Sequence, residues 1–243
     1  LKLYDNSRLK TRLADKYRAR KWLAEQIGEE YLVPLLGVWK RFDDINFDKL
    51  PNQFALKTNH GSGYNVIVKD KGEFDKQDAK KKFDKWMKIN YAYFGFELQY
   101  KRVPRRIIAE RFLENAEGLI DYRFYCFNGV PKQVWIDIYS GTPNHQREIY
   151  DIDFNPLPFT CRWPRAGGLL DQRPVNYDKM VAFAKKLSQP FAFVRVDFFE
   201  VDSKLYMGEM TFSPMNGLST FDPPEWDDKL GDMITLPSRK KVR

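Results

Sequence analysis

A stretch near the end of the chain, residues 193–212, has the pattern of two strands that pair as one hairpin. Apolar residues occupy every second position of the first strand, at Val194, Val196 and Phe198, and the second strand repeats the alternation. Since successive side chains of a strand point to opposite faces, one face of the hairpin belongs on a hydrophobic core. The rest of the fold is therefore expected to be organised around this hairpin.

The other face of the hairpin carries two acidic residues. A three-residue loop at 202–204, a common hairpin length, sets Asp197 opposite Glu209 and Arg195 opposite Thr211. Directly opposed side chains have Cβ atoms about 4.5–5.5 Å apart, so the two carboxylates repel unless a positive group lies between them. A hard divalent cation with oxygen ligands, such as Mg²⁺ bridging phosphates, is the natural candidate.

A solvent-facing polar side of an ordinary amphipathic hairpin is the alternative explanation of the same pattern. Large apolar residues share the face with the carboxylates, at Phe193, Phe199, Leu205 and Met207. Their presence favours a lined cleft over a plain solvated surface.

The charge balance of the chain points to an anionic partner. The 243 residues include 41 Lys and Arg against 33 Asp and Glu, a net charge of +8. Such a surplus suits a nucleotide, an acidic glycan, nucleic acid or a membrane surface, and it does not choose among them. Hydrophobic residues make up 43% of the sequence and aromatic residues 16%, which predicts a folded protein of one large domain or two small lobes.

Several classes of protein are disfavoured by the composition. Two cysteines are too few for a disulfide framework, and two histidines make a multi-histidine zinc site improbable. No apolar run approaches the roughly 18 residues of a membrane span, so we expect no transmembrane segment.

Two cations lie on the first expected helix, residues 13–27, which should end at Gly28. Lys16 and Arg20 are four residues apart and fall on the same side as the apolar stripe. Cations in such places usually extend past the core to water, but these two could also project into an anion site. The sequence pattern leaves both explanations open.

A glycine-rich turn follows the expected strand 54–58. Residues 59–63 read Asn-His-Gly-Ser-Gly and lead into a second expected strand, residues 64–69. Such a turn lets backbone N–H groups approach an anion closely, and Lys57 just before it adds a point charge. The same residues would also make an ordinary hairpin turn, and they do not form a Walker A loop.

Strands dominate the remaining pattern, and helices are expected to cover one face of each sheet, which is an α+β organisation. Asn128-Gly129 is a strong signal for a two-residue hairpin turn. The other expected helices are residues 75–88 and 177–187, and the other expected strands are 106–113, 121–127 and 131–139.

In this order the motifs resemble the ATP-grasp superfamily, and nearly the whole chain resembles its TupA-like family, found with bacterial teichuronopeptide, capsule and exopolysaccharide synthesis. The stretches that carry the resemblance are Leu13–Arg20, Ile27–Tyr31, Leu35–Trp39, Leu56–Gly63, Ile108–Glu110 and Phe193–Phe198. Each stretch is weakly specific alone, and their number and order make the match specific.

The resemblance implies an α+β ATP-grasp fold in which two lobes clasp ATP between antiparallel sheets. On this basis residues 1–53 form an N-terminal connecting segment, residues 54–110 a small lobe with the glycine-rich loop, and residues 111–243 a large lobe with the metal-binding hairpin and C-terminal tail. The usual N-terminal substrate lobe has no counterpart here, so the acceptor site is expected to be incomplete.

The resemblance also assigns residues to the nucleotide. Lys16 and Lys57 match the lysines that bind ATP phosphates, a flexible loop closes over the phosphates, a hinge reads adenine with its backbone, and Glu117 accepts from a ribose hydroxyl. The loop residues are His60, Gly61, Ser62 and Gly63, and the hinge residues are Glu110, Arg111, Phe112 and Leu113.

Metal and catalytic roles follow from the same resemblance. Asp197 and Glu209 match the metal carboxylates, and Thr211 stands where most ATP-grasp enzymes have Asn as the third ligand. This departure puts the coordination of a second metal in doubt, since a hydroxyl is a weaker ligand than an amide oxygen. Arg195 would sit beside an acyl-phosphate, and with Lys57 it is the expected catalytic residue.

The function implied is an ATP- and Mg²⁺-dependent carboxylate–amine ligase that forms an amide through an acyl-phosphate. Its partners would be ATP, an acidic glycan or small carboxylate such as a uronic acid, and an amine such as an amino acid. The expected location is the cytoplasm, with peripheral action at the inner membrane face as an option. The alternatives are a glycosyltransferase of polysaccharide assembly, against which the lack of a compact Asp-x-Asp motif counts, and a basic module that binds polyanions; nucleic acid is disfavoured.

Overall fold

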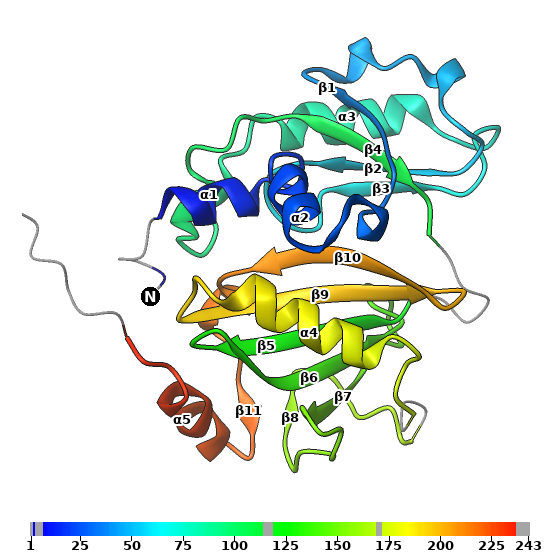
Figure 1. The fold of residues 1–243 in the computed structure, drawn as a ribbon. Helices are drawn as coiled ribbons and strands as arrows, with labels where there is room; N and C mark the ends of the chain where they lie inside the picture. The colour runs from blue at the N-terminus through cyan, green and yellow to red at the C-terminus, as the bar shows by residue number, and fades with distance from the viewer. Residues whose placement is uncertain (1, 3–6, 114–118, 169–171, 237–243) are drawn as a thin grey trace, which may run out of the picture. The chain divides into compact units, whose positions relative to one another are not determined.

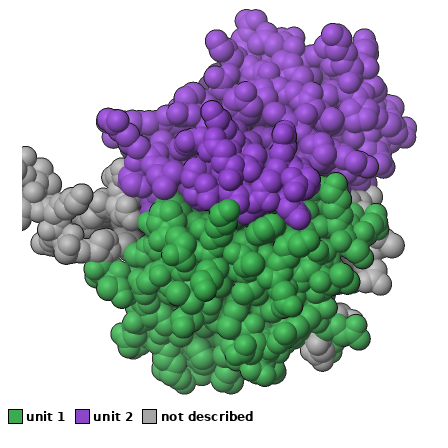
Figure 2. All heavy atoms as spheres, viewed as in Figure 1, with its two compact units in different colours: residues 1, 114–243 green, residues 2–113 purple. Residues whose placement is uncertain are grey.

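The computed structural model describes residues 2, 7–113, 119–168 and 172–236, which form two compact units (Figure 1). The N-terminal unit consists of the described residues up to 113, and the C-terminal unit of those from 119 onward (Figure 2). Residues 7–53 belong to the same unit as the strands that follow them, and the three-part division expected from the sequence stays a prediction.

The N-terminal unit is built on a four-stranded antiparallel sheet with the order β1-β4-β2-β3. The strands are β1 (Leu35–Trp39), β2 (Phe54–Thr58), β3 (Asn65–Val68) and β4 (Ile107–Arg111). The α-helices are α1 (Arg8–Ala14), α2 (Ala19–Ile27) and α3 (Lys76–Trp86). Short 3₁₀ helices are η1 (Glu29–Tyr31), η2 (Phe42–Asp44), η3 (Phe47–Lys49), η4 (Tyr91–Tyr93) and η5 (Leu98–Tyr100).

Helix α3 packs on this sheet through the face that its sequence pattern predicts. Ala79 and Phe83 of α3 join one hydrophobic core with Phe54 and Leu56 of β2. The carboxylate of Asp75 accepts hydrogen bonds from the backbone of Gln77 and Asp78 and so caps the helix, as expected.

The expected single helix over residues 13–27 is wrong. The chain forms two helices, α1 and α2, separated at Asp15. The Asp15 carboxylate accepts from the backbone N–H groups of Tyr17 at 3.0 Å and Arg18 at 3.1 Å, and from the Asn59 amide at 2.8 Å. Such side-chain bonds offer the backbone an alternative to the helix. Lys16 therefore lies in the break between the helices.

The C-terminal unit is built on a five-stranded antiparallel sheet with the order β10-β9-β5-β6-β7. Its strands are β5 (Asp121–Phe127), β6 (Val130–Ile138), β7 (Gln146–Asp151), β9 (Phe193–Val201) and β10 (Lys204–Thr211). The other elements are β8 (Thr160–Cys161), which pairs with β11 (Phe221–Asp222), the helices α4 (Tyr177–Ser188) and α5 (Glu225–Asp232), and η6 (Pro214–Gly217). None of the helices in the described part of the chain is long and apolar enough to cross a lipid bilayer.

The two faces of this sheet are covered differently. Helix α4 lies across one face and buries Met180, Ala184 and Leu187 fully, as its pattern predicts. On the opposite face, a second core gathers around Trp135 with residues of β8, β11 and α5. The remaining part of that opposite face carries charged side chains, and this part contains the candidate site.

The hairpin forms as expected, but its turn and register differ from the prediction. The turn has two residues, Asp202 and Ser203, with φ values of 51° and 60°, so the predicted three-residue loop is wrong. A bulge later in β10 sets two residues, Gly208 and Glu209, against the single residue Asp197. The bulge restores the predicted pairing of Arg195 with Thr211.

The bulge leaves little room for a side chain at Gly208, because a Cβ atom there would lie 3.0 Å from the Asp197 carbonyl oxygen. The other predicted hairpin turn is confirmed, since Asn128 and Gly129 both have positive φ between β5 and β6. The mixture of helices and antiparallel sheets confirms the α+β class.

Candidate functional site

In the N-terminal unit, one buried carboxylate holds two of the cations that the sequence singled out. Glu110 of β4 contacts Lys57 Nζ through Oε2 at 2.8 Å and Arg20 Nη1 through Oε1 at 3.2 Å. Arg20 also donates to the Val33 carbonyl at 2.8 Å. The sequence left open whether Arg20 extends to water or faces an anion site. In the structure its guanidinium is held inside the N-terminal unit. The Glu110 side chain thus positions Lys57, and the expected role of its backbone in the adenine hinge stays a prediction.

Lys16 lies against the glycine-rich loop. Its Nζ donates to the Gly61 carbonyl at 2.7 Å, and its backbone N–H donates to the Asn59 carbonyl at 2.9 Å. Gly61 and Gly63 have φ values of 79° and 77°, which favour glycine at both positions. The structure therefore brings Lys16 against the glycine-rich loop. That loop joins β2, which carries Lys57, to β3.

The four loop residues are not equally placed to meet a ligand. Ser62 and Gly63 are exposed, whereas Gly61 and His60 are buried. The His60 ring packs edge-on to Tyr64 and lies 3.3 Å from the Trp86 carbonyl. Burial lowers the pKa of His60, so it is neutral at pH 7. A nucleotide role for His60 stays a prediction.

The expected adenine hinge borders a cavity. Arg111 and Phe112 line a hollow of about 570 Å³ together with residues of β1 and of the segment before β2, namely Leu36, Pro51, Asn52 and Gln53. The Arg111 N–H already donates to the Pro34 carbonyl at 2.9 Å, so this group is committed to the sheet. Leu113 follows β4 and is half-buried, and Glu117 lies outside the described residues.

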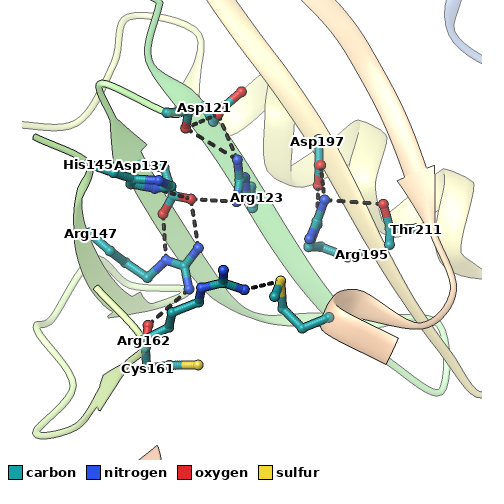
Figure 3. Close-up of polar contacts among 12 residues, drawn as sticks. Asp121, Arg123, Asp137, His145, Arg147, Cys161, Arg162, Arg195, Asp197 and Thr211 are labelled. Carbon is teal, nitrogen blue, oxygen red and sulfur yellow. Dashed lines mark hydrogen bonds and ion pairs between the residues drawn. The ribbon is translucent and has the colours of Figure 1, made fainter. Parts of the chain in front are cut away.

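In the C-terminal unit, Arg195 contacts all three expected metal residues, of which Figure 3 shows Asp197 and Thr211. Its guanidinium donates to both oxygens of Asp197, at 2.7 and 2.5 Å. It also reaches Thr211 Oγ1 at 3.1 Å and Glu209 Oε1 at 3.5 Å. The positive charge between the two carboxylates is thus the Arg195 guanidinium.

Burial shapes the electrostatics of this cluster. It raises the pKa of Asp197 to about 6, although Arg195 opposes the shift. Burial alone would lower the pKa of Arg195, but Asp197 holds it well above its usual range. A deeply buried carboxylate of this kind is stabilised by any further positive charge that comes near it.

The donor set fits a hard divalent cation. Asp197, Glu209 and Thr211 offer only oxygen atoms, and the Thr211 hydroxyl donates to Glu209 at 3.1 Å, so the three side chains converge. No group of three or more His, Cys, Asp or Glu side chains able to hold a metal occurs in the described ranges. Thr211 as the third protein ligand stays a prediction, and Arg195 already lies between Asp197 and Glu209.

A second charged cluster on the same sheet face escaped the sequence analysis (Figure 3). Its centre is Asp137 of β6, which is fully buried. Arg147 of β7 donates to its two oxygens at 2.5 and 2.7 Å, His145 lies 3.1 Å away, and Arg123 of β5 makes a further ion pair. Burial alone would raise the pKa of Asp137, but Arg147 and Arg123 hold it below its usual range.

This cluster adjoins the Arg195 cluster through β5. Arg123 is the cross-strand partner of Asp197, and it donates to Asp121 at 2.7 Å. A signal was present in the sequence, since Asp121-x-Arg123 places charges at alternate positions of one strand and Asp137 is a charge within the next expected strand. His145 lies just before β7 and Arg147 within it, and both are buried.

Comparison with known proteins gives one family and one fold. A family model described as TupA-like ATPgrasp matches residues 1–235. The crystal structure of D-alanine–D-alanine ligase from Bacillus anthracis complexed with ATP matches with a TM-score of 0.54 at 16% identity, covering 92% of this chain and 63% of that chain. A second structure of D-alanine–D-alanine ligase from the same organism gives a TM-score of 0.50 at 16% identity, covering 91% and 66%. Comparison with curated protein sequences gives no match.

The chain spans just under two thirds of the length of these ligases, and at this level of identity the likeness concerns the fold. The expected ATP-grasp fold is confirmed. Because the family model extends over almost every residue of the sequence, the chain belongs to the TupA-like ATP-grasp family.

Proposed function

We propose that the protein is an ATP- and Mg²⁺-dependent carboxylate–amine ligase. The observation that carries the proposal is the convergence of Arg195, Asp197, Glu209 and Thr211 at one end of the β9–β10 hairpin. Family membership supports the proposal, as does the ATP in the similar D-alanine–D-alanine ligase structure. A substrate on a cell-surface polysaccharide or its precursor, such as a uronic acid joined to an amino acid, is part of the same proposal.

The reaction proceeds in two displacements. A carboxylate oxygen bonds to the γ-phosphorus of ATP as the bond to ADP breaks, which gives an acyl-phosphate. An amine nitrogen then bonds to the acyl carbon, phosphate leaves and the nitrogen loses a proton. Such chemistry needs no covalent protein nucleophile, because positioning and charge neutralisation lower the barrier.

The proposal gives each cation a separate role. Lys16 and Lys57 bind ATP phosphates, and Arg195 stabilises the negative charge that develops on the acyl-phosphate. Mg²⁺ held by Asp197, Glu209 and Thr211 would neutralise phosphate charge when it is bound. In the ligand-free arrangement, Glu110 holds the Lys57 ammonium in place, which reduces the conformational entropy lost on binding. The cytoplasm, which supplies ATP, is the proposed place of action.

Mg²⁺-ATP is expected to stabilise the protein against heat, by about 2.7 kcal/mol at roughly 100 times its Kd. GTP should stabilise it less, because hinge residues 110–113 are proposed to read adenine.

Lys57→Ala should weaken ATP binding about tenfold, because it removes a charge-assisted hydrogen bond. Lys81→Ala, which removes an exposed lysine from α3 of the same unit, is the control and should leave binding unchanged.

Thermal shift with ATP, GTP, CTP and UTP, with and without Mg²⁺, measures these effects. Equal stabilisation by all four nucleotides would contradict the assignment of the hinge. Unchanged ATP affinity in Lys57→Ala would show that Lys57 serves only Glu110.

A further inference from the structure

Three large aromatic side chains are exposed within four consecutive positions of the N-terminal unit. Tyr93 is 63% exposed, Phe94 54% and Phe96 61%. They lie in residues 90–100, which we call the aromatic loop. Single exposed apolar residues are common on protein surfaces, but a group of adjacent ones marks an interaction site.

The aromatic loop is held in a defined shape rather than being a loose link. Tyr91 packs edge-on to Tyr100 with ring centroids 5.1 Å apart, and it stacks with Phe94 at 5.9 Å. A further edge-on contact, at 5.7 Å, anchors Tyr91 to Tyr64 beside β3. Tyr91 therefore packs inward, while Tyr93, Phe94 and Phe96 stay largely exposed.

The backbone at the tip of the loop is strained. Gly95 has a φ of 62° and Phe96 a φ of 56°. A left-handed conformation is ordinary for glycine but costly for a bulky aromatic residue. Burial does not offset this cost, because the Phe96 ring remains exposed. Strain of this kind at an exposed side chain is typical of a functional surface.

Cations surround the aromatic loop on both sides along the chain. The exposed basic residues of segment 85–106 are Lys85, Lys88, Lys101, Arg102 and Arg105. The guanidinium of Arg105 donates to the Met87 carbonyl at 3.2 Å, so the two basic flanks lie side by side. Glu97 is the one acidic residue of the segment, and it is buried. The exposed charged side chains of segment 85–106 are therefore all positive.

We propose that the aromatic loop and its basic flanks dock the protein on an anionic lipid bilayer. Aromatic rings favour the interfacial layer of a membrane, and nearby Lys and Arg side chains are attracted to anionic headgroups. Charge complementarity selects the lipid, since a neutral bilayer gives the five cations no counterpart. The bilayer surface is also where a lipid-linked substrate would be found.

A sugar polymer is a weaker fit to the same surface. Recognition of sugar hydroxyls draws on carboxylates and amides beside the rings, and Asn90 is the one such side chain of residues 90–100 that is not buried. Glu97 and Gln99 are buried, and the Asn90 side chain is committed to the Ala92 N–H at 3.2 Å. Two of the three exposed rings are phenylalanines, which have no hydroxyl of their own and favour insertion among acyl chains.

Co-sedimentation of the full chain with vesicles tests the proposal. The protein should bind phosphatidylcholine vesicles that contain phosphatidylglycerol, bind pure phosphatidylcholine at least tenfold more weakly, and dissociate in high salt. Two double variants should each lower the affinity for anionic vesicles about tenfold or more. The first combines Phe94→Ser with Phe96→Ser, and the second combines Lys101→Glu with Arg102→Glu.

Two control variants make changes of the same kind at single positions of the C-terminal unit. Val175→Ser alters a side chain that is 81% exposed, and Lys132→Glu reverses an exposed charge; both should sediment like the wild type. Melting temperatures confirm that each variant is folded. Equal binding to neutral and anionic vesicles, or no loss in either double variant, would overturn the proposal. So would binding to polygalacturonate but not to vesicles, because that result assigns the surface to an acidic glycan.

Discussion

Asp137→Asn is expected to destabilise the C-terminal unit by about 3–5 kcal/mol, the usual cost of breaking a buried ion pair from one side. The Asp137 carboxylate is fully buried, and it forms ion pairs with both Arg147 and Arg123. An amide of the same size takes the counter-charge away from the buried Arg147 guanidinium, while Arg123 keeps its ion pair with Asp121. Equilibrium denaturation, followed by near-ultraviolet circular dichroism, measures the loss.

The matched control is Asp202→Asn, which makes the same change at an exposed turn where φ is 51°. Asn tolerates this conformation well, so stability should stay within about 0.5 kcal/mol of the wild type. An equally small effect in Asp137→Asn would show that the charged cluster contributes little to the fold.

The same carboxylate predicts a pH dependence with a definite sign. Its folded pKa lies below the ordinary value of 3.8, so its stabilisation is fully present above that value and is lost as pH falls through the folded pKa. Acid titration of unfolding should therefore show a loss of stability below about pH 4 that is smaller in Asp137→Asn. Identical acid profiles would contradict the pKa assignment.

Asp197→Asn is expected to lower ATP-dependent phosphate release by a factor on the order of 10²–10³, the usual effect of removing a catalytic electrostatic contact. If Asp197 and Glu209 repelled each other, Asp197→Asn would relieve the repulsion and be more stable than the wild type. The structure predicts the opposite, because Asp197 accepts both hydrogen bonds from the buried Arg195 guanidinium. The melting temperature without metal should fall.

Glu209→Gln separates the loss of activity from the loss of stability. The Glu209 side chain is 37% exposed and lies 3.5 Å from Arg195, so a glutamine in its place should leave the stability of the fold almost unchanged. Phosphate release with Mg²⁺-ATP should nevertheless drop, because a proposed metal ligand is gone. Near-normal turnover in both Asp197→Asn and Glu209→Gln would contradict the proposed metal site and would weaken the ligase proposal.

Local pattern predicted the elements whose determinants are close in sequence. Alternation at Val194, Val196 and Phe198 gave β9, and Asn128-Gly129 gave the turn between β5 and β6. The break after α1 was not predictable in this way, because its cause includes Asn59, more than 40 residues away.

The candidate site shows the same division between local and distant causes. The Arg195–Thr211 pairing was expected, but the bulge at Gly208 that produces it depends on how closely the Asp197 backbone approaches. The Asp137 cluster combines charges from three strands, so its members become neighbours only once the sheet order is known.

The central claim is that the protein activates a carboxylate by phosphorylation, and hydroxylamine trapping tests it most directly. Folded wild-type protein is incubated with ATP, Mg²⁺, hydroxylamine and glucuronate, galacturonate or an amino acid. The ligase proposal predicts ADP and a hydroxamate in equal amounts, only when a suitable acid is present, and strongly reduced amounts with Asp197→Asn. The ligase proposal would be contradicted if the folded protein formed no hydroxamate with any acid but released a nucleoside diphosphate from a sugar-nucleotide donor. That result would identify a glycosyltransferase.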